Sequence, residues 1–270
     1  MPPCAMSIAM DNYPFRLLKT GYGSAFYNMG LDEALLEAVS RGASPPVLRL
    51  YGWNPPAVSV GYFQGLTEEI DLDACKRYGV DVVRRISGGG AVFHQAELTY
   101  SMVMPLTHPL AGSTIHESYE LLCAGIVRGL DLLGVPSRFI PINDIVSGER
   151  KISGNAQTRR MGCLLQHGTV LLENKADLMF ELLRVPSQKL KGKLIQNVKD
   201  RITSLKTLLG RPVPFAEAED ALAEGFSRAL SLEFIRAEGE TLDAPTRQEE
   251  RRARELAVEK FGSHGWLFKR

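Results

Sequence analysis

Three consecutive glycines, Gly88 to Gly90, constrain this chain more than any other feature of its sequence. The apolar, β-branched residues Val80, Val82 and Val83 precede them and are typical of a buried strand, and a second strand-like run begins at Ala91. Glycines in a row cost backbone entropy, so they are expected where the chain turns sharply or where a ligand lies against bare amides. Arg84 and Arg85 suit an anionic ligand here, because a guanidinium pairs bidentately with phosphate or carboxylate. A plain glycine hairpin with solvated arginines is the alternative.

Motifs and composition together exclude several classes of protein. The glycine loop lacks the Gly-Lys-Ser/Thr of a Walker A loop and the G-x-G-x-x-G spacing of a dinucleotide-binding fold. A net charge of +1 on 270 residues gives no support for a nucleic-acid partner or a membrane-surface role. No apolar run reaches the ~18 residues of a membrane span. The four cysteines stand far apart without metal-ligand spacing, so we expect reduced thiols in the cytoplasm and no metal site.

The hydrophobic pattern alternates helices and strands without a clear linker. Helices are expected at residues 25–39, 71–78, 114–133, 175–184, 214–230 and 245–261, and strands at residues 47–51, 57–63, 97–104, 143–146, 150–158 and 163–172. We expect one domain over residues 15–270, with residues 215–270 as a candidate small helical cap, after a frayed N-terminus over residues 1–14. Mixed strands with helices predict an α/β fold of the mixed, α+β kind rather than a doubly wound parallel sheet.

A second group of polar residues lies in the expected strand that begins at Lys151. Residues 151, 153, 155, 157 and 159 share one face of such a strand, and all five are polar. An edge strand facing solvent would give the same pattern and is the plainer interpretation. The glycine loop in the same chain favours the other interpretation, in which both stretches bind a phosphorylated or carboxylate ligand.

At these two stretches the sequence resembles the lipoate–protein ligase and octanoyltransferase family, which is related to the biotin ligases. The matching residues run in order from about residue 22 to the end of the chain, at similar separations. They are residues 84–94, Asn143-Asp144, residues 150–157, Gln166-His167-Gly168-Thr169, Tyr51-Gly52-Trp53, residues 59–64, residues 98–101 and Trp266.

The resemblance implies a single catalytic domain in which mixed β-sheets and flanking helices enclose a tunnel for a fatty-acyl or lipoyl chain. By analogy, Lys151 is the catalytic lysine that contacts the acyl carbonyl and the α-phosphate. A fixed ammonium there would stabilise the oxyanion of a tetrahedral intermediate. The resemblance places the following residues around the substrate or nucleotide: Arg85, Ser87, Gly88, Gly89, Gly90, Ala91, Val92, Phe93, His94, Asn143, Asp144, Ser153, Gly154, Ala156, His167, Gly168 and Thr169.

Two activities of the family remain open. The ligases use ATP with Mg to convert lipoate or octanoate into an acyl-adenylate. They then pass the acyl group to a lysine of a lipoyl domain or of a glycine-cleavage-type carrier protein. The transferases act without ATP and resemble thiol enzymes that form an acyl-cysteine. Residues 95–101 and 154–172 look closer to the transferase branch.

The cysteine positions favour the ligase. The loop over residues 134–146, where one transferase branch has its cysteine, contains none, and the position used by the other branch holds Ser187. Cys163 would lie ~13 Å from His167 on the same strand, so we interpret it as a core residue. We therefore expect an ATP-dependent lipoate–protein ligase, with a separate accessory ligase subunit as a further expectation. A binding module without chemistry and a biotin ligase remain alternatives, and Lys151 argues against the binding module.

Overall fold

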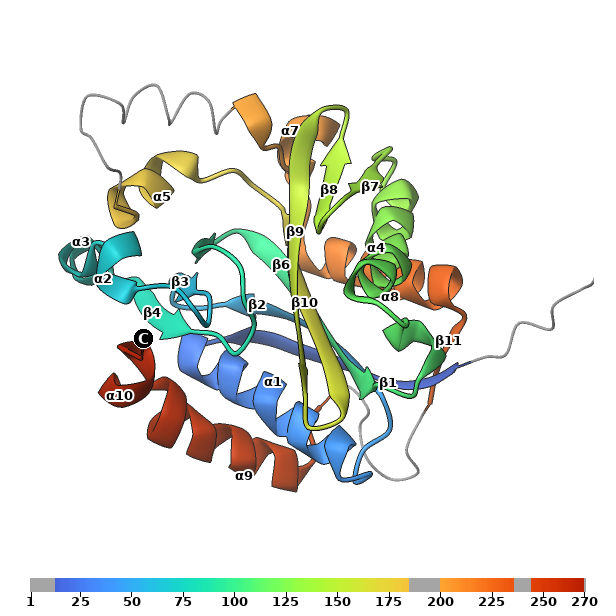
Figure 1. Ribbon diagram of the computed structural model, residues 1–270. Helices are drawn as coiled ribbons and strands as arrows, with labels where there is room; N and C mark the ends of the chain where they lie inside the picture. The colour runs from blue at the N-terminus through green and yellow to red at the C-terminus, as the bar shows by residue number, and fades with distance from the viewer. Residues whose placement is uncertain (1–12, 185–199, 236–243, 270) are drawn as a thin grey trace, which may run out of the picture.

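The computed structural model describes residues 13–184, 200–235 and 244–269. A large sheet of mixed strand directions runs through the molecule, with helices against both of its faces (Figure 1). Its strands follow the order β11 (Leu232–Phe234), β1 (Tyr13–Gly23), β2 (Val47–Trp53), β6 (Glu97–Pro105), β10 (Cys163–Leu171), β9 (Arg150–Arg160), β8 (Asp144–Ser147) and β7 (Arg138–Ile140). The strands from β2 to β7 pair antiparallel, whereas β1 pairs parallel with both β2 and β11. The expected mixed α/β fold is confirmed.

Alternation along each strand divides the core between the two faces of this sheet. On β6, Tyr100 and Met102 pack into one hydrophobic cluster and Val103 into the other. Helices α4 (Ile115–Leu132) and α8 (Phe215–Leu230) cover the first face, and helices α1 (Ala25–Ser40) and α9 (Arg247–Leu256) pack together over the second (Figure 1). Residues 215–270 therefore contribute one long helix to each layer. Helices α4 and α8 approach so closely that a Cβ atom at Gly225 would lie 2.3 Å from the backbone nitrogen of Gly129.

A small second sheet carries the glycine loop. It has the order β4 (Asp81–Arg84), β3 (Ala57–Val60), β5 (Val92–His94), with β3 parallel to β4 and antiparallel to β5. The glycine loop connects β4 to β5, and β3 lies between those two strands. The loop is therefore a crossover connection, and its interpretation as a plain hairpin is wrong.

Local sequence signals set several element ends as expected. The Asp71 side chain accepts from the backbone N–H of Ala74 at the start of α3 (Leu72–Tyr78), and Gly79 ends that helix in the left-handed region, where glycine is favoured. Thr114 caps α4 by accepting from the Glu117 N–H, and the Glu117 carboxylate in turn accepts from the Ser113 N–H.

Other boundaries differ from the expectations. The long strand β1 begins at Tyr13, inside the stretch expected to be a frayed terminus. The strand expected at 57–63 ends at Val60, and the helix expected to reach residue 261 ends in a π-helical turn at Ala257–Phe261. The remaining short helices are α2 (Leu66–Glu69), a 3₁₀ turn at Pro109–Ala111, α5 (Ala176–Leu182), α7 (Leu205–Leu209) and α10 (His264–Leu267). Residues 1–12 and Ser187 lie outside the described residues.

Candidate active site

A cavity of about 330 Å³ lies between the second face of the large sheet, the small sheet and helix α5. Most of the residues predicted for the site line it. These are Arg85, Gly89, Gly90, Ala91, Val92, Phe93, His94, Asn143, Lys151, Ser153, Gly154, Ala156, His167, Gly168 and Thr169. Ser87, Gly88 and Asp144 do not line it, but each contacts a residue that does, so the structure brings the whole predicted set together.

A β-bulge points Lys151 into this cavity. Strand β8 pairs Ile145 with Ser153 and the next residue, Val146, with Lys151, so Ile152 is an extra residue on β9. An extra residue reverses the alternation of side chains beyond it. Lys151 therefore lies on the same face as Gly154, where a Cβ atom would be only 2.8 Å from the lysine Cε and Nζ atoms.

Because of this bulge, the predicted polar face of β9 splits in two. Lys151 faces the cavity, whereas Gln157 and Arg159 reach the first turn of α4, where Gln157 Nε2 donates to the Ile115 carbonyl. Strand β9 lies between β8 and β10, so its interpretation as an edge strand facing solvent is wrong. Its polar side chains hold α4 against the sheet.

Lys151 forms an ion pair with Asp144, with the Nζ atom 2.6 Å from Oδ1. Both side chains are partly exposed, 41% for the lysine and 36% for the aspartate, so this end of the cavity is open to solvent. A reciprocal contact beside Asp144 fixes the backbone: the Asn143 amide donates to the Asn155 carbonyl, and the Asn155 amide donates to the Asn143 carbonyl at 2.9 Å. The open end thus has a positioned cation and a positioned carboxylate.

The two arginines of the glycine loop bind backbone carbonyl groups of the protein itself. Arg84 is fully buried and donates to the carbonyls of residues 61, 62 and 64 and to that of Leu267. Arg85 donates to the carbonyls of Ser59, Gly88 and Gly90, and burial lowers its pKa to about 10. The prediction that both cations serve an anionic ligand is wrong for Arg84, which is not among the residues that line the cavity, and the Nη groups of Arg85 hold the loop closed.

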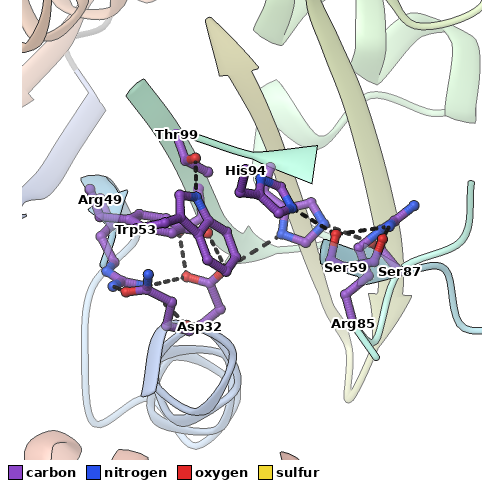
Figure 2. A network of polar contacts seen from close by, with 12 residues as sticks. Asp32, Arg49, Trp53, Ser59, Arg85, Ser87, His94 and Thr99 are labelled. Carbon is purple, nitrogen blue, oxygen red and sulfur yellow. Dashed lines mark hydrogen bonds and ion pairs between the residues drawn. The ribbon is translucent and has the colours of Figure 1, made fainter. Parts of the chain in front are cut away.

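A wall of buried polar residues also lines the cavity, and Figure 2 shows Ser59, His94 and Thr99 of this wall. His94 Nε2 lies 2.7 Å from the Ser59 hydroxyl and His94 Nδ1 lies 2.7 Å from Glu97 Oε1. Ser59, His94 and Glu97 are only 1%, 5% and 3% exposed. Trp53 stacks on the His94 ring at a centroid distance of 4.0 Å. The second carboxylate oxygen, Glu97 Oε2, is buried and has no hydrogen-bond partner among the residues that the structure describes.

A second buried network ties the glycine loop to helix α1. Ser87 Oγ lies 2.6 Å from His167 Nε2, and His167 Nδ1 lies 3.4 Å from Asp32 Oδ2. Asp32 also accepts from Arg49 at 2.7 Å in an ion pair that is almost completely buried (Figure 2). Burial lowers the pKa of His167. Burial alone would raise the pKa of Asp32, but its contacts with His167 and Arg49 hold it below the usual value.

The strand pairing of the large sheet gives the distance between the open end of the cavity and the polar wall. Thr99 on β6, Thr169 on β10 and Gly154 on β9 form one row across three neighbouring strands. Neighbouring strands lie 4.7–4.9 Å apart, so this row spans about 10 Å. Lys151 lies over Gly154, at one end of this row. Glu97 lies on β6, two residues before Thr99, at the other end. The open end and the polar wall are therefore on opposite sides of the cavity.

Sequence reasoning missed Asp32, Arg49, Glu97 and Thr99 as members of these networks. Asp32 and Arg49 carried a usable signal, because each is a charged residue inside a predominantly apolar helix or strand. Buried charges of this kind require a partner.

The comparisons with known proteins agree with this arrangement. The family model for the lipoyl protein ligase A/B catalytic domain matches residues 24–227. The octanoyltransferase LipM of Symbiobacterium thermophilum is 39% identical over 93% of this chain and 97% of that protein, and the LipM of Bacillus subtilis (strain 168) is 35% identical over 97% of this chain and 100% of that protein.

Solved structures show the same fold. A bi-partite lipoate protein ligase from Thermoplasma acidophilum, solved with its E2 lipoyl domain, matches with a TM-score of 0.82 at 31% identity, over 96% of each chain. A lipoate-protein ligase A bound with ATP matches with a TM-score of 0.78 at 30% identity, over 95% of this chain and 98% of that one.

The fold and the site define an enzyme domain for acyl groups of the lipoyl class. The chain belongs to the lipoyl protein ligase A/B catalytic domain family. The expectation of an ATP-dependent ligase is wrong: the curated relatives that cover nearly the whole chain, at 33–39% identity, are named octanoyltransferase. The prediction relied on the absence of a cysteine at the two positions that the transferases use. The similarity of residues 95–101 and 154–172 to the transferases was the better indicator.

Proposed function

We propose that this chain is an octanoyltransferase, which moves an octanoyl group from a thioester donor to a lysine side chain of a lipoyl-domain carrier protein without ATP. The relatives named octanoyltransferase support the reaction, and the neighbouring structure solved with its lipoyl domain supports the acceptor. An accessory ligase subunit and Mg have no part in this reaction. The three described cysteines are free thiols, which suits the reducing cytoplasm as the compartment.

One observation supports this proposal most strongly: a cavity with an ammonium group at its open end and a closed wall about 10 Å away. That length is similar to the length of an extended chain of eight carbons. Lys151 would contact the acyl carbonyl, where its charge stabilises the oxyanion of the tetrahedral intermediate. The carbonyl end must lie at the open end, because both the donor and the acceptor are macromolecules that cannot enter the cavity.

The test is a transfer assay in ATP-free buffer with an octanoyl thioester of a carrier protein and a purified lipoyl domain. We expect a mass increase of one octanoyl group on the lipoyl domain, and none when its target lysine is replaced by arginine. Lys151→Met should lower the rate by about 100-fold or more, as for the loss of an oxyanion donor. Lys76→Met, an exposed lysine on α3, is the matched control.

Free octanoate with ATP provides the opposing arm of the assay. If the lipoyl domain gains octanoate only when ATP is present and never from the thioester, the proposed function is wrong.

A further inference from the structure

We propose that Met29 sets the length of the acyl chain that the cavity accepts, because its side chain closes the cavity at the end away from Lys151. This inference rests on the proposed function and names a residue that determines its substrate. It follows from the register of the large sheet, the packing of helix α1 and the contacts of the two aromatic side chains beside Met29.

The row of residues that crosses the cavity continues beyond Thr99. Tyr51 on β2 pairs with Thr99 on β6, so the row that starts at Gly154 and passes through Thr169 has a fourth member. Three strand spacings place Tyr51 about 14 Å from Gly154. Both residues line the cavity. The cavity therefore extends past Thr99 and ends at strand β2.

Helix α1 closes this end of the cavity. Met29 is 3% exposed, lines the cavity and packs in the same hydrophobic cluster as Tyr51 and Trp53. Helices α1 and α9 both fall within the part of the chain that the structure describes, and Met29 is the one residue of these two helices in the lining. An acyl chain that starts at Lys151 and follows the row therefore meets Met29 with its last carbons.

Hydrogen bonds fix the two large neighbours of Met29. The Trp53 indole donates to Thr99 Oγ1 at 2.7 Å (Figure 2), and the Tyr51 hydroxyl donates to Asp32 Oδ2 at 3.1 Å. Met29 carries only a thioether, which is a weak acceptor, on an unbranched side chain with three rotatable bonds. Among these three side chains, Met29 is the one that packing alone holds in place, so its size decides how much space remains.

The backbone of α1 is held from both sides. Arg49 donates to Asn28 Oδ1 and to Asp32 Oδ1, each at 2.7 Å, and these two residues flank Met29 in the helix. Behind the helix, Gly30 lies so close to α9 that a Cβ atom would be 2.4 Å from a backbone carbonyl oxygen of that helix. A smaller side chain at position 29 should therefore leave free space, because the helix cannot move to fill it.

The size of residue 29 then determines the preferred substrate. Replacement of Met29 by Ala removes the three heavy atoms beyond Cβ, and a chain with about two more methylene groups would bury them in that space. Replacement by Phe would instead fill space that the end of an octanoyl chain occupies. The two variants should change the length preference in opposite directions.

Transfer rates provide the first test. Hexanoyl, octanoyl and decanoyl thioesters of one carrier protein are compared as donors, with the lipoyl domain as acceptor. In Met29→Ala the ratio of kcat/KM for decanoyl to that for octanoyl should rise by about 10-fold or more, and in Met29→Phe hexanoyl should gain on octanoyl. Met104→Ala is the matched control, because it removes the same atoms from a buried methionine on the other face of the sheet. It should keep the length preference of the parent.

Binding of the free fatty acids provides a test that needs no transfer. In thermal unfolding, octanoate should raise the melting temperature of the parent more than decanoate does. The order should reverse in Met29→Ala, because decanoate fills the space that the substitution leaves. Circular dichroism shows whether each variant is folded, and Met29→Phe decides the question if Met29→Ala is not.

The two proposals fail in different ways. If no thioester serves as a donor but the fatty acids bind in the expected order, the proposed function is wrong and the role of Met29 stands. If octanoyl is transferred but the folded variants at position 29 keep the length preference of the parent, the proposed function stands and Met29 does not set the chain length.

Discussion

His167 Nε2 lies 2.6 Å from Ser87 Oγ, and this contact joins the middle of strand β10 to the glycine loop. On its other side the same ring contacts Asp32, which Arg49 holds within the core. The loop is therefore positioned by a chain of buried polar groups that begins in helix α1. Its own sequence does not specify this position.

Replacement of His167 by Phe should destabilise the protein. Ser87 and Asp32 would each lose a partner while remaining buried, and an unsatisfied buried polar group costs about 1–3 kcal/mol. We expect a lower free energy of unfolding in urea denaturation by about that amount. His116→Gln, at an exposed position on α4, is the control and should leave the unfolding free energy unchanged. A His167→Phe variant as stable as the parent would contradict this account of the network.

The same network predicts a pH dependence of stability. The pKa of His167 is lower in the folded protein than in the unfolded chain, so the unfolded chain binds more protons. Stability is then fully present above the unfolded pKa of about 6.5 and falls as the pH decreases through the folded pKa. Asp32, whose folded pKa is also lowered, adds a loss of the same sign at more acidic pH. Thermal unfolding between pH 8 and pH 5 should follow this trend, and the part due to His167 should disappear in His167→Phe.

Gly154→Ala should displace Lys151. The new Cβ atom would lie 2.8 Å from both Cε and Nζ of the lysine, which is closer than such contacts occur. The lysine can move because it is the far end of a flexible side chain, so we expect a folded protein with a turnover lowered by about 10-fold or more. Gly265→Ala, where a Cβ atom meets nothing within 4 Å, is the matched control. Normal turnover of Gly154→Ala would show that the position of the ammonium does not matter.

Arg84→Met should affect stability more than any exposed arginine does. The change would leave four backbone carbonyls, one buried and three partly buried, without their charged donor, and we expect a loss of about 3 kcal/mol or more. Arg77→Met, on the exposed side of α3, is the control. Calorimetric melting of both variants measures the difference, and equal melting temperatures would mean that Arg84 is not a structural clamp.

Local signals predicted much of the fold, because periodicity and capping act over a few residues. Helix α1 and the Asp71-capped α3 lie where their patterns place them. Strand β1 was missed because its alternation is weak: Arg16, Lys19 and Thr20 interrupt it, and its pairing partners lie far along the chain.

The site was harder to predict than the fold. The motif residues do gather in one cavity, but the roles of individual side chains depend on long-range contacts. Arg84 and Arg85 are adjacent in the sequence, and only the positions of Leu267 and Ser59 decide that one clamps a loop to the last helix while the other lines the cavity. Likewise, the bulge that turns Lys151 inward depends on the register with β8, which residues 150–160 alone do not specify.

The Arg84 clamp also has a consequence for biosynthesis. Its guanidinium joins a loop at residues 61–64 to the carbonyl of Leu267, and the Trp266 indole donates in turn to the Arg84 carbonyl. A ribosome makes the loop some 200 residues before it makes those partners. During translation, the side chain of Arg84 therefore lacks the Leu267 carbonyl, which accepts two of its five hydrogen bonds in the folded protein. The loop at residues 61–64 gains its connection to helix α10 only after that helix has left the exit tunnel, so a prematurely released chain would lack this connection.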